Sequence, residues 1–340
     1  MPSWRVHRDV TGDVYDALCS MYGGRWSCDI DINEVVEHVV DPDRNPDTVL
    51  TVTEKCVCDG KEVDITYCRE QSSYTSSGYS RRCVVESRRE ERGARHHGGL
   101  NEVMWKYYLL LAARSYVVDN DRSTKCCWAL ARALHYAQDG VLSRKVQVVG
   151  VFGTYTSGDF HDTVEDALDT YAYGYLKPEI LQRLVMEGVN AALREPPMRI
   201  RPTHEFFNPD ISVTTVIENA IKATAYTFAK FFEIINYANN RKESINRVVR
   251  RLRSISSIGI AIFILSILLM VSLHQPGISN AMSALLVIGL ILTLTWPLYR
   301  SFKAPELYVL GIISYPTSML RIRIRKGAAI ITETYKPLLT

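Results

Sequence analysis

The stretch that decides the fold is SISSIGIAIFILSILLMVSL, residues 254–273, which is followed closely by AMSALLVIGLILTLTWPLY, residues 281–299. Neither run contains a charged residue. Each reaches the length of about 20 residues that a helix needs to cross a hydrocarbon core about 30 Å thick. Buried helices of soluble proteins are usually shorter and carry a polar stripe. The sequence therefore predicts a transmembrane hairpin over residues 254–299, with Pro276-Gly277 in its short turn.

Basic residues lie on both outer flanks of this hairpin, whereas the turn between the spans has neither Lys nor Arg. Short loops rich in Lys and Arg stay on the cytoplasmic side of a membrane. We therefore expect an integral membrane protein that crosses the bilayer twice, with both termini in the cytoplasm. The flanking residues expected at anionic lipid head groups are Arg247, Arg250, Arg251, Arg253, Arg300 and Lys303.

The small net charge of +3 conceals an uneven distribution along the chain. Residues 1–240 contain 27 basic and 34 acidic side chains, whereas residues 241–340 contain 13 basic and 3 acidic ones. A basic region next to apolar spans favours a lipid surface, so we expect no nucleic-acid partner. The mean hydropathy of −0.05 is too low for a protein made mostly of spans.

Residues 1–211 are predicted to form an acidic cytosolic domain of the α+β class, mainly helical with a small β-hairpin. Asp59-Gly60 between two β-rich runs over residues 50–70 is a strong hairpin signal. The Arg-rich residues 71–99 are expected to be a mobile loop. A strand is expected at 145–152, and helices at 9–22, 32–40, 100–118, 123–138, 159–175 and 178–194.

A long helix over residues 212–253 is predicted to lead into the first span, because apolar residues recur there at spacings of four and three. This seam consists of Ile217, Ile221, Phe228, Phe231, Ile235, Ile245, Val249 and Leu252. It can pair with copies of itself, which makes a homo-oligomer, or pack on the helices of the same chain. Apolar residues off the seam, such as Tyr226 and Phe232, favour packing within the chain over 213–238 and a freer basic stalk over 239–253.

Residues 300–340 are predicted to form a short, β-rich basic tail. Its basic face is Arg321, Arg323 and Arg325, opposite Leu320, Ile322 and Ile324, and Lys326-Gly327 is a candidate turn. The face can be simply solvated. Alternatively, it lies against lipid head groups or an acidic protein surface, and the chain's own first domain is one such surface.

Cys56 and Cys58, with Cys68 and possible fourth ligands such as Cys83, are weak candidates for a zinc site. In the expected hairpin Cys56 and Cys58 share one face and Cys68 lies on the other. We therefore predict reduced, buried thiols in place of a metal site, as is usual in the cytosol. No catalytic motif is present, so we expect no catalytic residue and no cofactor.

These observations lead to one expected function and two alternatives. We expect a membrane-anchored, self-associating, non-enzymatic scaffold or effector whose cytosolic domain binds a protein partner or a signal. The first alternative is an oligomeric pore formed by the two spans. The second is a membrane-tethered enzyme with its site in the cytosolic domain.

Overall fold

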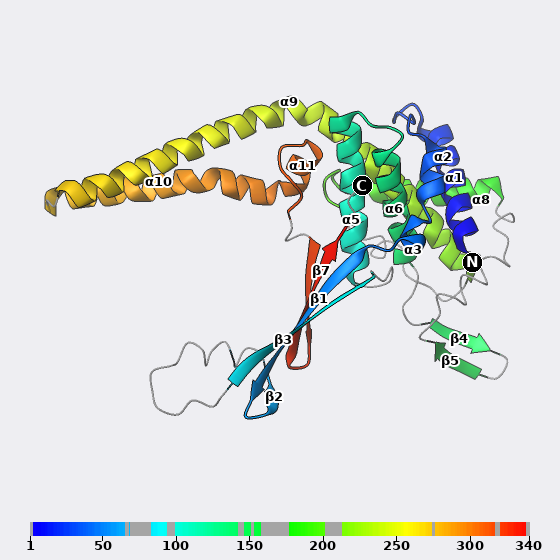
Figure 1. Ribbon diagram of the computed structural model, residues 1–340. Helices are drawn as coiled ribbons and strands as arrows, with labels where there is room; N and C mark the ends of the chain where they lie inside the picture. The colour runs from blue at the N-terminus through cyan, green and yellow to red at the C-terminus, as the bar shows by residue number, and fades with distance from the viewer. Residues whose placement is uncertain are drawn as a thin grey trace. The chain divides into compact units, whose positions relative to one another are not determined.

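The fold is mostly helical, with a small antiparallel sheet and two long apolar helices (Figure 1). The chain divides into two compact units, Met1–Ile234 with Pro316–Thr340, and Ile235–Tyr315. We call these the globular unit and the hairpin unit. The computed structural model describes residues 3–64, 68, 83–93, 99–141, 146–150, 153–157, 177–200, 213–273, 276–316 and 320–337.

The helices of the globular unit form close to the expected positions. They are α1 (Ser3–Tyr22), α2 (Ile32–His38), α3 (Asp41–Arg44), α5 (Gly99–Arg114), a π-helical turn η1 (Ser115–Asp119), α6 (Lys125–Gly140) and α8 (Pro178–Leu193). Two Asp side chains cap their helices: Asp31 accepts the backbone N–H groups at the start of α2, and Asp121 does so at the start of α6. The helix expected at 159–175 lies outside the described residues.

The main sheet is built around strand β1 (Thr48–Cys58). Strand β3 (Cys83–Gly93) pairs with β1 along its whole length. The other edge of β1 pairs with β7 (Ala329–Lys336) and, near its end, with β2 (Lys61–Val63). Strand β6 (Arg321–Lys326) completes the sheet beside β7, and β4 (Val146–Gly150) and β5 (Gly153–Ser157) form a separate hairpin.

The β1–β2 turn agrees with the sequence prediction. Asp59 and Gly60 have φ values of 49° and 74°, and Cys58 pairs with Lys61. Both central residues of a type I′ turn need positive φ, which Asp and Gly tolerate best. The expectation of a loop over residues 71–99 is wrong for residues 83–93, which form β3. Its Arg- and Glu-rich residues pair with β1 while their side chains stay exposed.

The long helix α9 (Val213–Leu273) runs without interruption from the globular unit into the hairpin unit. Its first part is buried on all sides. Trp105 donates its indole N–H to Thr227 at 3.2 Å, and Phe228 and Phe232 contact Tyr15 and Trp26. A helix that is apolar around its whole circumference must be surrounded by protein or lipid, and here α1, α5, α6 and α8 surround it.

The hairpin unit consists of the rest of α9, helix α10 (Pro276–Phe302) and the short helix α11 (Ala304–Val309). Pro276 is the first residue of α10, where its missing N–H costs no hydrogen bond. Tyr237 on α9 donates to Glu306 on α11 at 2.5 Å.

The C-terminal segment does not form a unit of its own. Residues 316–340 belong to the globular unit, because β7 is hydrogen-bonded to β1. Gly327, with φ of 61°, lies in the β6–β7 turn. Ion pairs also join these strands to the acidic part of the chain: Arg325 pairs with Asp64, and Lys336 lies 3.0 Å from Glu91.

Candidate functional site

The first candidate region is the apolar surface of α9 and α10. Two helices, over Thr215–Ser272 and Ala281–Phe302, are long and apolar enough to cross a membrane. In the most apolar 18-residue stretch of each helix, only 17% and 6% of the residues, respectively, are buried within the protein. Leu265, Val271 and Ile291 are 57%, 67% and 61% exposed. A contiguous apolar surface of this size is unusual on a soluble protein.

Small residues allow α9 and α10 to approach closely. A Cβ atom added to Gly259 would lie 2.5 Å from the backbone nitrogen of Thr293, and one added to Gly289 would lie 2.8 Å from that of Phe263. Ser256 donates its hydroxyl to the Thr293 carbonyl at 2.8 Å. Close backbone approach through glycine and serine is the packing that helices use in lipid.

The basic residues expected at the lipid head groups are all exposed on the hairpin unit. They are Arg247, Arg250, Arg251, Arg253, Arg300 and Lys303. Arg253 stacks over the ring of Trp296, with 4.8 Å between the guanidinium carbon and the ring centroid. Lys303 also pairs with Glu306 at 3.1 Å. Whether these residues meet a lipid surface remains a prediction.

The heptad seam lies inside a single chain. Seven of its members are buried and Leu252 is half-buried; the seven are Ile217, Ile221, Phe228, Phe231, Ile235, Ile245 and Val249. The interpretation of packing within the chain therefore agrees with the structure better than a stalk of paired copies does. Pairing of this seam with a second copy would require the packing within the chain to open.

The cysteines differ from the expectation of reduced thiols. Three disulfides are present: Cys19–Cys28, Cys56–Cys68 and Cys58–Cys83. The β1–β2 register is as expected, but β2 ends at Val63, so Cys68 is not on a strand opposite β1 and can reach Cys56. The Sγ atoms of Cys56 and Cys58 lie 3.7 Å apart, so both bonds form one sulfur cluster. Cysteines bonded to one another do not offer thiolates to zinc.

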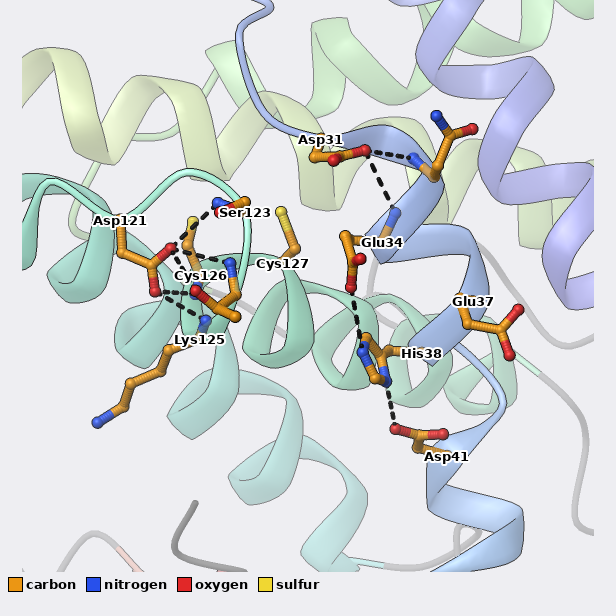
Figure 2. A network of polar contacts seen from close by, with 12 residues as sticks. Asp31, Glu34, Glu37, His38, Asp41, Asp121, Ser123, Lys125, Cys126 and Cys127 are labelled. Carbon is orange, nitrogen blue, oxygen red and sulfur yellow. Dashed lines mark hydrogen bonds and ion pairs between the residues drawn. The ribbon is translucent and has the colours of Figure 1, made fainter.

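Cys126 and Cys127 are the exceptions, and both are buried thiols in α6. Figure 2 shows them beside Asp121, whose carboxylate accepts four backbone N–H groups, from Ser123 to Cys126. Burial raises the pKa of Cys127 to about 12 and raises that of Cys126 further. Thiols with raised pKa values are poor nucleophiles, so these two residues are packing residues.

Helix α6 carries an unusual number of buried polar side chains. Arg132, which is 1% exposed, pairs with Asp47 at 3.0 Å. Tyr108 and Tyr136 both donate to the same carboxylate, at 2.7 and 2.6 Å. Burial, and then the Asp47 charge, raise the pKa values of both tyrosines. The Asp47 carboxylate is thus bonded by one guanidinium and two hydroxyls, although Nε of Arg132 has no hydrogen-bond partner among the described residues. A buried carboxylate held in this way indicates a structural role for the network.

One turn further along α6 lies a second polar group, which we call the His–Asp cluster: buried His135 and Asp139 with half-buried His7 and Asp43. Nε2 of His135 lies 3.1 Å from Asp139 Oδ2 and 3.4 Å from Asp43 Oδ1. Nε2 of His7 lies 3.7 Å from Asp139 Oδ1, and the two imidazole centroids are 4.7 Å apart. Three separate helices, α1, α3 and α6, bring these groups together.

The cluster shifts the pKa values of its histidines in opposite directions. Burial, and then the proximity of His135, lower the pKa of His7. Burial also opposes protonation of His135, but Asp139 and then Asp43 outweigh it and raise its pKa to about 10. Burial likewise opposes ionisation of Asp43, but hydrogen bonding to His135 and the charge of His135 together lower its pKa. Without a bound ion, the cluster therefore holds its proton on His135.

Only one local pattern in the sequence points to this cluster. His135 and Asp139 are spaced i, i+4, which places both on one face of a helix. His7 and Asp43 lie far away in the sequence.

No family model, curated protein or solved structure matches this chain.

Proposed function

We propose that this chain is a membrane-anchored, non-enzymatic scaffold or effector, in which the hairpin unit crosses a bilayer and the globular unit binds a protein partner or a signal. The observation that carries the proposal is the exposed apolar surface of α9 and α10. In water, this surface would be an aggregation liability. In a bilayer it would contact lipid, and the close approach at Gly259 and Gly289 would hold the spans together.

The basic flanks support an orientation with both termini on the cytoplasmic side. Arg253 over Trp296 would lie at the membrane interface, where a cation and an amphipathic ring are both favoured. The three disulfides argue for the opposite side, because such bonds persist in oxidising compartments. The basic flanks and the disulfides thus predict opposite sides of the membrane for the globular unit, and one measurement of its orientation decides between them.

Two measurements on the full chain expressed in cells test the anchor and its orientation. We expect the protein to stay in the membrane pellet after alkaline carbonate extraction; its release into the supernatant would contradict the anchor. Protease added to sealed vesicles that expose their cytoplasmic face should digest the globular unit. Two results together would overturn the cytoplasmic orientation. The globular unit would be protected from the protease, and its disulfide-bonded cysteines would not react with an alkylating reagent added before lysis.

Self-association is a further part of the proposal and needs a surface other than the buried seam. The lipid-facing sides of α9 and α10 offer one, because they remain exposed in the single chain. We expect the detergent-solubilised protein to be larger than a monomer by mass photometry. A monomer at all concentrations would remove self-association and leave the anchor intact.

The alternative of a pore receives little support from the described part of the spans. The hydroxyls of Ser266, Thr293 and Thr295 donate to carbonyls of their own helices, at 2.7–2.8 Å. Ser266 is also only 2% exposed, so it adds little to a polar face for ions. Liposomes that contain the protein should remain tight to ions and dyes.

A further inference from the structure

The feature of the globular unit that membrane anchoring does not explain is the His–Asp cluster. One ligand atom from each of His7, Asp43 and His135 lies within 4.8 Å of the others, and the Asp139 carboxylate contacts both imidazoles. We propose that His7, Asp43, His135 and Asp139 bind one divalent transition-metal ion, with Zn²⁺ the best match, as a structural site that joins α1 and α3 to α6.

The distances agree with a tetrahedral site. Bonds of about 2.0–2.1 Å from zinc to nitrogen and oxygen separate neighbouring ligand atoms by about 3.3–3.4 Å. Nε2 of His135 lies 3.1 Å from Asp139 Oδ2 and 3.4 Å from Asp43 Oδ1, and Nε2 of His7 lies 3.7 Å from Asp139 Oδ1. One ligand atom each from His7, Asp43 and His135 can therefore reach a shared ion. The two Asp139 contacts use different oxygens, so Asp139 becomes the fourth ligand by turning one oxygen toward the ion.

Hydrogen bonds around Gln138 fix which nitrogen of His7 faces the cluster. Thr224 donates its hydroxyl to the Ala220 carbonyl, so it can only accept the hydrogen bond from the Gln138 amide nitrogen, at 2.9 Å. The amide oxygen of Gln138 therefore faces Nδ1 of His7 and accepts a hydrogen bond from the N–H group at this nitrogen.

This assignment leaves a lone pair on Nε2 of His7 when the ring is neutral, and that lone pair points to the Asp139 carboxylate. Two electron-rich atoms 3.7 Å apart repel each other unless a cation lies between them. A hydrogen bond from the outer ring nitrogen to a protein oxygen is also the usual arrangement around a metal-binding histidine.

Nε2 of His135 points to the same place. This one nitrogen faces two carboxylates, Asp43 and Asp139, and a single N–H cannot be directed fully at both. A metal ion would accept the nitrogen lone pair and bind an oxygen from each carboxylate. The charge of a divalent ion would also match the two carboxylates, of which Asp139 is buried and therefore costly to leave without compensation.

The ligand set determines the kind of site. Imidazole nitrogen and carboxylate oxygen are ligands for zinc and its neighbours in the first transition row. Four protein ligands leave no open position for a water or substrate, as in structural sites. The inference is independent of the membrane anchor, because it concerns the globular unit alone.

The test uses the full chain purified in detergent without reductant, treated with chelator and then titrated with Zn²⁺ or Co²⁺. We expect one ion per chain by elemental analysis, a higher melting temperature with Zn²⁺, and the visible spectrum of tetrahedral Co²⁺ without a thiolate charge-transfer band. A thiolate band would place the ion at cysteines and overturn the proposal. So would the absence of a bound ion.

His7→Gln is the main variant, because His7 lies at the edge of the cluster and its loss should leave the fold intact. We expect its Zn²⁺ affinity to fall by more than the 10–100-fold typical of losing an outer hydrogen bond, and its melting temperature to become independent of Zn²⁺.

The matched control is His38→Gln. His38 also contacts two carboxylates, Glu34 at 3.4 Å and Asp41 at 2.7 Å, but it lies at the surface between α2 and α3 (Figure 2). We expect this variant to bind Zn²⁺ as the unmodified chain does. Equal Zn²⁺ affinity in His7→Gln and the unmodified chain would overturn the proposal.

Discussion

The two parts of helix α9 are one continuous element in two different environments. Up to Ile235 its residues are buried by the chain's own helices, including polar ones such as Thr224 and Lys230. Beyond Ser254, Ile258 and Leu265 are more than half exposed although the sequence there is more apolar. An apolar helix face thus predicts that the helix packs against a nonpolar neighbour. It does not predict whether that neighbour is protein or lipid.

A charge in the exposed part tests this difference most strongly. Leu265→Arg combined with Ile291→Arg should prevent stable membrane insertion, because each Arg costs about 2.5–3.5 kcal/mol near the centre of a span. On a water-exposed surface the same changes would alter stability by only about 0.5 kcal/mol each. Carbonate extraction measures the result.

The control for that experiment is Val248→Arg, an exposed position among the basic residues before the span. It should remain in the membrane pellet. Normal insertion of the double variant would mean that the exposed faces of α9 and α10 do not contact lipid.

A cavity in the buried part should affect folding and leave insertion intact. Phe228→Ala should lower the free energy of unfolding of the globular unit by about 3–5 kcal/mol, because a fully buried ring is removed. Denaturant unfolding in detergent, followed by Trp fluorescence, measures it.

Phe302→Ala is the matched control, because Phe302 is 83% exposed. If Phe228→Ala instead caused a loss of stability that depended on protein concentration, the seam would be pairing with a second chain.

Lys230 allows a test by pH. It is fully buried and donates to the carbonyls of Glu195 and Pro196, at 3.2 and 3.1 Å. Burial lowers its pKa from 10.5 to about 8, against the smaller opposite effect of Glu195 and Glu233. Between these values the unfolded chain binds more protons, so stability should rise with pH, by on the order of 3 kcal/mol.

The melting temperature of Lys230→Met should not rise between pH 8 and 10.5. The control is Lys222→Met, on the same helix, where the ammonium is partly exposed and pairs with Glu187 at 2.8 Å. The control variant should keep the rise. Parallel curves for both variants would show that Lys230 is not responsible.

The smallest effect is expected at the contact between the spans. Gly259→Leu should destabilise the hairpin by about 1–3 kcal/mol, because the added side chain meets the α10 backbone. Ala261→Leu, at an exposed position two residues away, should change little. Melting by circular dichroism in micelles compares the two, and equal midpoints would contradict the close approach.

Features set by neighbouring residues could be predicted from the sequence. The two apolar runs and the Asp59-Gly60 turn form where expected, because chain geometry and residue type decide them locally. A strand forms over residues 321–326, but Ile324 is 44% exposed, so the expected apolar face is incomplete. The long helix was also predictable from its apolar spacing. Charge patterns predicted which residues flank the spans, but they could not say what those residues contact.

Features that depend on distant residues could not be predicted. The sequence predicts a loop where strand β3 forms, because its Arg and Glu side chains are typical of exposed segments, whereas its backbone pairs with β1. Cys68 was placed on the wrong face because the sequence does not show that β2 ends at Val63. His7 and Asp43 gave no local sign that they lie beside His135.

The sequence by itself determined that this chain has two helices able to cross a membrane, because length and the absence of charge are sufficient for that. The tertiary structure alone decided which half of α9 is covered by protein, which cysteines are bonded and which histidines meet carboxylates. The physical reason is that burial, disulfide pairing and a shared ligand site are properties of pairs of residues distant in the sequence. The chain brings such pairs together only when its helices and strands pack.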